Sequence, residues 1–263
     1  MILVLAAVVL YLAAAGWLSR QFAKGVATVP GAALLPAFGA VVLHAIAHVQ
    51  GTLAAGAVEL HFFAALSLVG LAVAGLVAAL SLARPIGALG VVVFPLAAVL
   101  LLLYRLGAHY RPTVALDWPI QLHAGLALLA FAALSVAALL AIMLWLQERA
   151  LRRRQLASAL RAFPPLTMLE ALLFRLIGVG FALLTLALLT GVVFVENLFA
   201  QHLMHKTVLS LLAWAAFGAL LFGRLRYGWR GRRAVRLTLT AMTLLVLAFF
   251  GSKYVLEMLL MRS

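Results

Sequence analysis

The chain of 263 residues contains no cysteine. Disulfide frameworks, CxxC thiol exchange and thiolate metal sites all need a cysteine sulfur, so the sequence excludes them. A role as a dithiol reductant is excluded for the same reason.

Charge is scarce and one-sided. Charged residues make up 10% of the chain, with 6 acidic side chains against 20 lysines and arginines, while hydrophobic residues make up 67%. A net charge of +14 would suggest a nucleic-acid partner in a soluble protein. Here the basic residues gather in short segments between long apolar runs, where they orient membrane helices and meet anionic headgroups. We therefore expect a lipid bilayer as solvent, membrane lipids as partners and no nucleic acid.

The apolar runs predict the fold class. A helix needs about 20 apolar residues to cross the hydrocarbon core of a bilayer. The sequence predicts an all-α, polytopic transmembrane bundle of about eight spans, forming a single transmembrane domain over residues 1–263. The predicted spans are Ile2–Leu18, Ala32–Val49, Leu60–Leu82, Ile86–Tyr104, Trp118–Leu146, Leu169–Val195, Thr207–Phe222 and Ala234–Val255.

Basic residues predict the orientation. No basic residue precedes the first apolar run, whereas Arg20 and Lys24 follow it. We interpret this run as an uncleaved first span with its N-terminus outside the cytoplasm. With that orientation, 15 of the 20 lysines and arginines lie on the inside, as the positive-inside rule requires. Both termini are then expected on the non-cytoplasmic side.

The longest inside stretch, Gln147–Thr167, carries a run of arginines. It is either a solvated orientation signal or a basic helix lying along the headgroups.

The histidines gather on the side of the membrane opposite to most of the arginines. In the predicted orientation, all seven lie at or near the outer face: His44, His48, His61, His109, His123, His202 and His205. Ionisable groups at membrane depth are costly, so they are candidates for function. Neutral imidazole donates a lone pair to iron, zinc or copper, and paired histidines are common axial ligands of haem iron. The alternative is that interfacial histidines only hydrogen-bond to water and headgroups.

Local spacing adds detail to this candidate site. His44 and His48 are four residues apart and share one helical face, and His202 and His205 are three apart. Trp118 precedes His123, and Arg111 lies in the same outer region, where it could bind a haem propionate. Trp118 and Arg111 could equally be an interfacial belt residue and an ordinary loop charge.

Motifs of familiar enzymes are missing. The sequence has no HExxH, no GxSxG and no glycine-rich phosphate loop. We predict no catalytic residue and no enzymatic activity.

Several segments resemble the cytochrome c assembly family, which includes the haem-handling CcsA proteins, and within it the YpjD-like branch of bacterial inner-membrane proteins. The resemblance rests on four stretches and is best after Trp118. These are the Trp-x-x-x-x-His pattern with the following Phe-Ala-Ala-Leu (Trp118–Leu134), Arg175–Gly191, the inner hairpin Gly228–Arg233, and Phe250–Ser252. It implies a multi-pass protein of the bacterial inner membrane.

The resemblance also implies ligands. Members present haem on the outer face, using histidines that flank a tryptophan-rich loop, for attachment to an apocytochrome. His123 matches the histidine before that loop, and His44 matches a histidine of an early span. Haem is thus the implied cofactor, bound by His123 with His44 or His205 as its axial partner. Another membrane protein of cytochrome c assembly is the implied partner.

This chain departs from the family pattern at three places. No tryptophan occurs between Val195 and Trp214, Phe222 stands where a histidine is expected, and the outer C-terminal histidine is absent.

Three functions therefore compete. The first is a haem-binding or haem-handling membrane protein. The second is a haem-free regulatory or partner-binding subunit that kept the fold. The third is a small-molecule transporter, because interior Gly90 and Pro95 are typical of spans that line a pathway.

Overall fold

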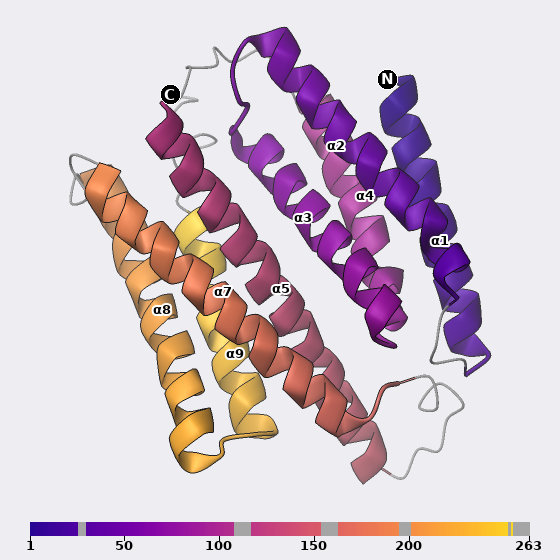
Figure 1. The fold of residues 1–263 in the computed structure, drawn as a ribbon, viewed down its shortest axis with the longest axis vertical. Helices are drawn as coiled ribbons and strands as arrows, with labels where there is room; N and C mark the ends of the chain where they lie inside the picture. The colour runs from indigo at the N-terminus through magenta and orange to yellow at the C-terminus, as the bar shows by residue number, and fades with distance from the viewer. Residues whose placement is uncertain (26–29, 108–116, 154–162, 195–200, 252–253, 255–263) are drawn as a thin grey trace. The chain divides into compact units, whose positions relative to one another are not determined.

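The computed structural model describes residues 1–25, 30–107, 117–153, 163–194, 201–251 and 254 (Figure 1). Within these residues there are helices and no strands. The α-helices are α1 (Ile2–Ala23), α2 (Leu35–Ala55), α3 (Phe62–Ala83), α4 (Gly90–Leu106), α5 (Trp118–Arg152), α7 (Leu166–Phe194), α8 (Gln201–Tyr227) and α9 (Arg232–Val246). Short 3-10 turns η1 (Gly31–Leu34) and η2 (Gly87–Leu89) precede α2 and α4, and a π-helical turn η3 (Leu247–Gly251) follows α9.

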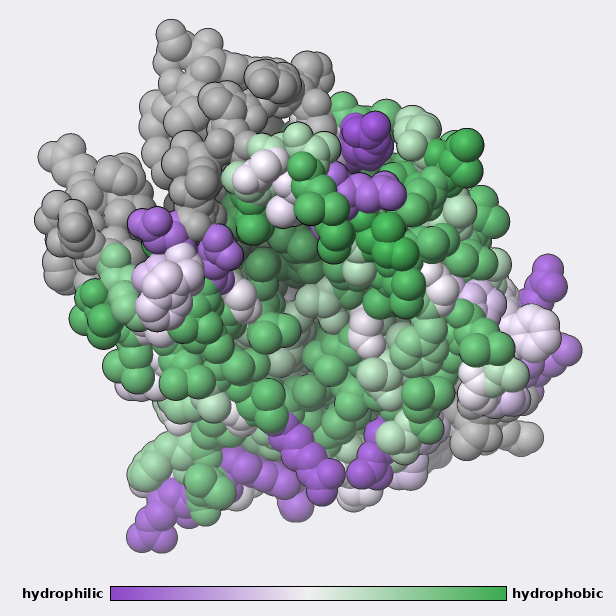
Figure 2. Space-filling view, turned by 45° about the horizontal axis from the view of Figure 1, so that its top comes forward, coloured by the Kyte–Doolittle hydropathy of each residue, from purple (hydrophilic) through white to green (hydrophobic). Residues whose placement is uncertain are grey.

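Eight of these segments are long and apolar enough to cross a membrane. Each of the eight predicted apolar runs falls on one of them, so the all-α bundle of about eight spans is confirmed. Figure 2 shows that hydrophobic side chains dominate the face in view, with hydrophilic ones gathered at its edges. Exposed apolar side chains on this scale suit lipid rather than water as the surrounding solvent.

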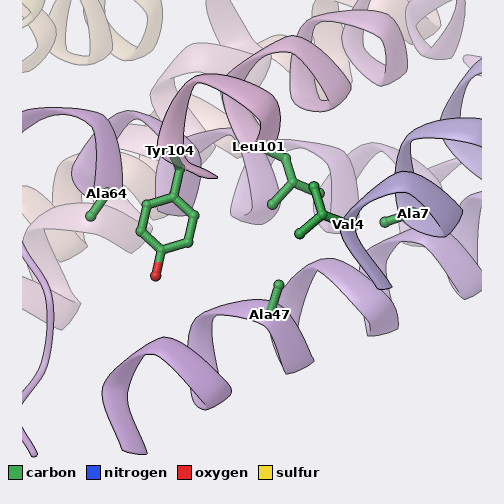
Figure 3. Close-up of a cluster of buried hydrophobic side chains, with 6 residues drawn as sticks. All are labelled: Val4, Ala7, Ala47, Ala64, Leu101 and Tyr104. Carbon is green, nitrogen blue, oxygen red and sulfur yellow. The ribbon is translucent and has the colours of Figure 1, made fainter. Parts of the chain in front are cut away.

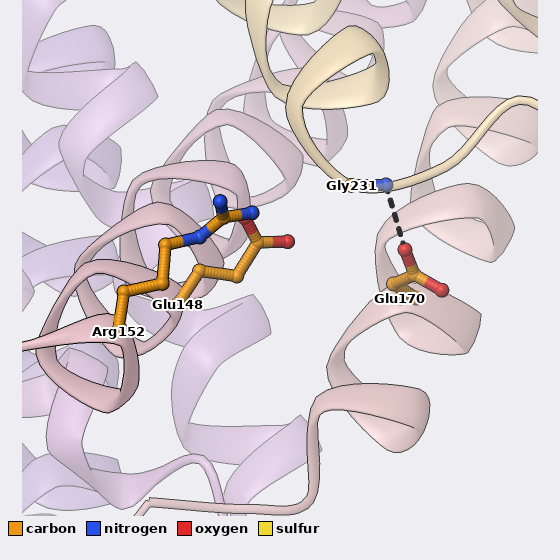
Figure 4. A network of polar contacts seen from close by, with 4 residues as sticks. All are labelled: Glu148, Arg152, Glu170 and Gly231. Carbon is orange, nitrogen blue, oxygen red and sulfur yellow. Dashed lines mark hydrogen bonds and ion pairs between the residues drawn. The ribbon is translucent and has the colours of Figure 1, made fainter. Parts of the chain in front are cut away.

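The basic stretch Gln147–Thr167 begins as a continuation of a span. Helix α5 extends to Arg152. The guanidinium Nη2 of Arg152 lies 4.0 Å from the carboxylate Oε2 of Glu148, one turn earlier (Figure 4). The Gln147 amide donates to the carbonyl oxygen of Pro164 at 3.0 Å, just before α7 begins. Residues 154–162, where a headgroup helix would lie, are outside the described residues.

Contacts within the chain define two compact units. The N-terminal unit comprises Met1–Leu116 and Gln147–Pro165, and the C-terminal unit comprises Asp117–Leu146 and Leu166–Ser263. That residues 1–263 act as a single domain stays a prediction.

Small residues bring the helices of the N-terminal unit close together. Helix α1 packs against α2 and α4, and α3 packs against α4 and α2. Without a hydrophobic driving force between helices in lipid, close approach through small side chains supplies the packing energy. One buried cluster joins all four helices through three alanines and three larger side chains (Figure 3): Val4, Ala7, Ala47, Ala64, Leu101 and Tyr104.

Glycines allow an equally close approach of α5 and α7 in the C-terminal unit. A Cβ atom at Gly180 would lie 2.6 Å from Leu134 Cγ, and one at Gly191 would lie 3.1 Å from His123 Cε1. The two glycines are eleven residues apart, as are Leu134 and His123, which is about three helical turns. The antiparallel pair α5 and α7 therefore meets along one face, with each glycine admitting one α5 side chain.

The connection between α8 and α9 is a tightly packed turn in the same unit. Gly228 and Gly231 have positive φ, which suits glycine. The Trp229 ring lies on Gly223, where a Cβ atom would come within 2.2 Å of the ring, and the Trp229 amide donates to the Gly223 carbonyl. The Arg224 guanidinium donates to the Trp229 carbonyl at 3.2 Å, which fixes the tryptophan from both sides.

A carboxylate completes this turn. Glu170 of α7 accepts a hydrogen bond from the Gly231 amide at 2.8 Å, immediately before α9 begins (Figure 4). The family-like hairpin predicted from the sequence is thus a structural lock between α7, α8 and α9.

Candidate functional site

His123 lies in the second turn of α5, against the end of α7. Its ring Nδ1 is 2.9 Å from the carbonyl oxygen of Ala187 and 3.2 Å from the hydroxyl of Thr190. The glycine at position 191 leaves room for the ring at this point. The side chain is half-buried, so it is held by α7 yet keeps an accessible edge.

These contacts determine the tautomer of His123. A carbonyl oxygen can only accept a hydrogen bond, so we place the proton of the neutral imidazole on Nδ1. The Thr190 hydroxyl donates back to the carbonyls of its own helix and leaves a lone pair for the same N–H. Nε2 therefore carries a lone pair, and it has no hydrogen-bond partner within the described part of the chain.

This is the arrangement that metal-ligating histidines usually have. Their second ring nitrogen donates to a carbonyl or carboxylate, which orients the ring and increases the basicity of the ligating nitrogen. The residues around His123 thus fit an iron ligand that binds through Nε2.

A cation and aromatic rings lie at the same end of the C-terminal unit. The Lys206 ammonium, near the start of α8, is 5.5 Å from the centroid of the Phe249 ring in η3. Phe249 and Phe250 both contact Phe131 of α5, with centroid distances of 5.9 and 5.2 Å. An ammonium beside apolar aromatic surface suits a flat hydrophobic ligand that carries carboxylates.

The other predicted site residues of this unit are less constrained. Trp118 is 70% exposed and meets Phe194 edge-to-face at 5.9 Å, beside the end of α7. His205 is exposed on α8, one residue before Lys206. Arg111, His109 and the side chain of His202 lie outside the described residues.

His44 occupies a different environment, in the N-terminal unit. It is fully buried, eleven residues before the end of α2, or about 16 Å along the helix axis. This is deeper than the outer end of the span, where the sequence suggested it. Both ring nitrogens are engaged: Nδ1 is 3.2 Å from the Tyr11 hydroxyl, and Nε2 is 2.8 Å from Ser67 Oγ.

Ser67 links the two histidines of α2. Its Oγ also lies 2.9 Å from His48 Nε2. The imidazole rings of His44 and His48 are stacked, with their centroids 5.4 Å apart. Tyr11 is fully buried, and His44 is the only hydrogen-bond partner of its hydroxyl among the described residues, so the phenol must donate to His44 Nδ1.

Hydrogen-bond direction then follows along the whole chain of groups. With Nδ1 of His44 accepting, its proton is on Nε2 and is donated to Ser67 Oγ. Ser67 has a single proton, which it donates to His48 Nε2. The proton of His48 is consequently on Nδ1. Ligation of iron by His44 would require this ring to break its bond to Ser67 or to Tyr11, so its role as a ligand stays a prediction.

A second polar contact extends the cluster toward the end of α2. Tyr104 stacks on His48 with centroids 4.3 Å apart and donates its hydroxyl to the Glu59 carboxylate. A Cβ atom at Gly51 would lie 2.3 Å from the Tyr104 hydroxyl, so only glycine leaves space for this bond. His61 begins α3 as its N-cap, with Nδ1 accepting from the Ala64 amide at 3.4 Å.

The structure places the candidate ligands in both units: His44 in the N-terminal unit, and His123 and His205 in the C-terminal unit. No group of three or more metal-ligating histidine, aspartate or glutamate side chains occurs among the described residues. Zinc sites of that type need such a group, whereas haem iron needs only one or two protein ligands. His123 is therefore the candidate whose geometry suits haem best.

Several residues that build these environments were not predicted. Tyr11, Ser67 and Thr190 are isolated polar residues inside apolar runs, and that is the one signal that marks them in the sequence. Lys206 is one of the five lysines and arginines that the predicted orientation leaves on the outer side. Nothing in the sequence alone indicates that it lies against Phe249 of a distant helix.

Known proteins provide an independent comparison. The inner membrane protein YpjD of Escherichia coli K12 is 39% identical over 137 residues, which cover 52% of this chain and 52% of that protein. An uncharacterized 28.8 kDa protein of Azospirillum brasilense is 38% identical over 143 residues, which cover 54% of this chain and 53% of that protein. The cytochrome c biogenesis protein CcsA of Gloeobacter violaceus is 30% identical over 110 residues, which cover 41% of this chain and 30% of that protein. The matched stretch thus spans about half the length of the first two relatives. No solved structure matches.

The family is established by a longer match. The sequence model of the cytochrome C assembly protein family matches residues 26–260. Together with eight membrane-spanning segments and relatives named as inner membrane and cytochrome c biogenesis proteins, this match identifies a multi-pass protein of the bacterial inner membrane. The chain belongs to the cytochrome C assembly protein family.

Proposed function

We propose that this chain is a non-enzymatic haem-handling membrane protein in which His123 is an axial ligand of the haem iron. The observation that carries the proposal is the pair of bonds at His123 Nδ1, to Ala187 and Thr190. They hold the imidazole as the tautomer whose Nε2 carries a lone pair, with no hydrogen-bond partner among the described residues, and can bind iron.

Other residues of the C-terminal unit support the same ligand. Lys206 offers a positive charge for a propionate, and the half-buried rings of Phe249 and Phe250 offer apolar surface for a porphyrin. His205, exposed and next to Lys206, is the candidate for the second axial position. Haem bound in this way would supply iron-centred redox or transfer chemistry, while the protein residues fix its position and neutralise its carboxylates.

Absorbance spectroscopy tests the proposal. The protein is expressed in haem-sufficient cells, purified in mild detergent and scanned for a Soret band, with haem quantified per chain. We expect a Soret band that His123→Ala removes. His61→Ala is a matched control, because His61 is an outer histidine of the other unit that caps α3. A wild-type protein without haem, or a band that His123→Ala leaves unchanged, contradicts the proposal.

A second candidate function is favoured by one feature of the sequence. The absence of tryptophan between Val195 and Trp214 removes the residues that the family resemblance associates with presenting haem. This candidate is a haem-free subunit that binds another membrane protein, with the exposed surface of the Trp229–Arg233 turn as the contact. Stoichiometric co-purification of a second membrane protein without haem, lost on replacing Arg230 and Arg233, favours it over haem handling.

A further inference from the structure

A groove lies between α5 and α9 in the C-terminal unit, at the opposite end of the unit from His123. Its volume is about 290 Å³. Residues from one face of each helix line it: Ile142, Trp145, Arg232, Val235, Arg236 and Leu239.

Both walls of the groove are apolar, and the α5 wall is accessible. Ile142 and Trp145 lie one turn apart on α5 and remain 40% and 38% exposed. Val235 and Leu239 lie one turn apart on α9 and form the opposite wall. Since both helices are membrane spans, this surface suits a hydrocarbon chain.

The end of the groove near the start of α9 is cationic. Arg232 and Arg236 are exposed, lie one turn apart on the same helical face, and have no hydrogen bond or ion pair within the described residues. The carboxylate that packs against this end of α9, Glu170, is engaged with the Gly231 amide. Two guanidinium groups are thus available to an anion beside the apolar walls.

The predicted orientation places this end at the cytoplasmic leaflet. The α8–α9 turn belongs to the inside segments that hold most of the arginines, and that leaflet is rich in anionic phospholipid. Trp145 is a residue type that prefers the boundary between headgroups and hydrocarbon. A guanidinium group can donate two parallel hydrogen bonds to the oxygens of one phosphate.

We propose that this groove binds an anionic phospholipid, with the phosphodiester on Arg232 and Arg236 and an acyl chain between the α5 and α9 walls. A free phosphate would satisfy the arginines but leave the apolar walls without a ligand. A zwitterionic phospholipid would bring its own cation toward the arginine pair and bind more weakly. The groove therefore selects for a diacyl lipid with net negative charge.

Lipid quenching of Trp145 fluorescence tests this site in the full-length protein. The protein is reconstituted in phosphatidylcholine vesicles that contain increasing fractions of phosphatidylglycerol brominated on its acyl chains, and the quenching that disappears in Trp145→Phe is measured. Brominated phosphatidylcholine in the same fractions is the comparison. We expect Trp145 quenching to saturate at a lower fraction of phosphatidylglycerol than of phosphatidylcholine.

The arginines should account for this difference. A basic residue near an anionic surface changes binding about fivefold, so Arg232→Gln with Arg236→Gln should weaken the preference for phosphatidylglycerol by about 25-fold. Arg233→Gln is a matched control, because it removes the same charge from the same turn of α9 at a position that does not line the groove. Trp145→Phe and Arg233→Gln also report whether the fold tolerates change here.

Three results would overturn the proposal. Equal quenching by the two brominated lipids would remove the charge selectivity. Equal effects of the double variant and Arg233→Gln would remove the specific role of the groove arginines. Competition by inorganic phosphate at millimolar concentration, as effective as that of unbrominated phosphatidylglycerol, would show an anion site without a lipid chain.

Discussion

The position of a single proton determines what His123 can bind. Ala187 and Thr190 hold that proton on Nδ1, and Gly191 leaves the space that the ring needs beside α7. The sequence identified the histidine and its neighbouring tryptophan. It could not identify the carbonyl that orients the ring, because every residue has a carbonyl and only the packing of α7 on α5 selects this one.

Filling the space at Gly191 should therefore remove haem although His123 is retained. A valine at this position places atoms where the imidazole lies, since even a Cβ would be 3.1 Å from Cε1. Gly178→Val is the matched control, because Gly178 is on the same helix and has nothing within 4 Å of its Cβ position. We expect haem per chain to fall several-fold in Gly191→Val and to stay near wild type in Gly178→Val. Equal haem content in the two variants would contradict this role of the glycine.

Ser67 offers a second test at the residue scale. Replacing it with alanine leaves two buried imidazole nitrogens without their partner, and each such group costs about 1–3 kcal/mol. Values for polar contacts in membrane proteins are smaller, about 0.6 kcal/mol on average, so we expect a loss of about 1–3 kcal/mol in total.

Ser81→Ala is the control for this loss. Ser81 is also buried on α3, but it donates only to the Val77 carbonyl of its own helix. Reversible unfolding in detergent and SDS mixtures measures both variants. The serine bridge is not supported if Ser81→Ala costs as much as Ser67→Ala.

At the scale of elements, the eight spans could be predicted from apolar runs, and their ends could not. Helix α5 extends six residues beyond its predicted end, and the Gln147 amide donates to the Pro164 carbonyl there, whereas the predicted boundary assumed that charge ends a span. The inner hairpin was recognised as a motif. Its physical reason, a tryptophan ring lying on Gly223, depends on a contact between residues six apart across a turn.

Gly223→Ala tests this lock between α8 and α9. Alanine is the better helix former by about 0.5–1 kcal/mol, so the same change at Gly178 should be neutral or stabilising. At Gly223 the added methyl would lie 2.2 Å from the Trp229 ring, and overpacking of this kind costs about 1–3 kcal/mol. Thermal unfolding in detergent should therefore show a lower melting temperature for Gly223→Ala and no decrease for Gly178→Ala. A melting temperature for Gly223→Ala at or above that of wild type would contradict the lock.

At the scale of the whole molecule, composition alone predicts a membrane protein, and the distribution of arginines predicts its orientation. The same distribution assigns His123 to the outer face and the Arg232–Arg236 groove to the inner face. What composition cannot provide is the division of the chain into two compact units, because that depends on which helices pair.

The absence of cysteine makes this orientation easy to test. Single cysteines can be introduced without background at Ala54, exposed near the end of α2, and at Arg230, exposed in the α8–α9 turn. In intact cells, a membrane-impermeant maleimide should label Ala54→Cys and should reach Arg230→Cys only after the membrane is opened. The reverse pattern would place the histidines on the cytoplasmic side and contradict the predicted topology.

The central claim is that His123 binds haem iron through Nε2. The most direct measurement is chemical rescue: His123→Gly is purified with and without free imidazole, and haem per chain is determined from the pyridine haemochrome spectrum. The account predicts that His123→Gly loses haem and that imidazole, entering the space of the missing ring, restores it together with the wild-type Soret maximum. Full haem content in His123→Gly without imidazole would contradict the claim.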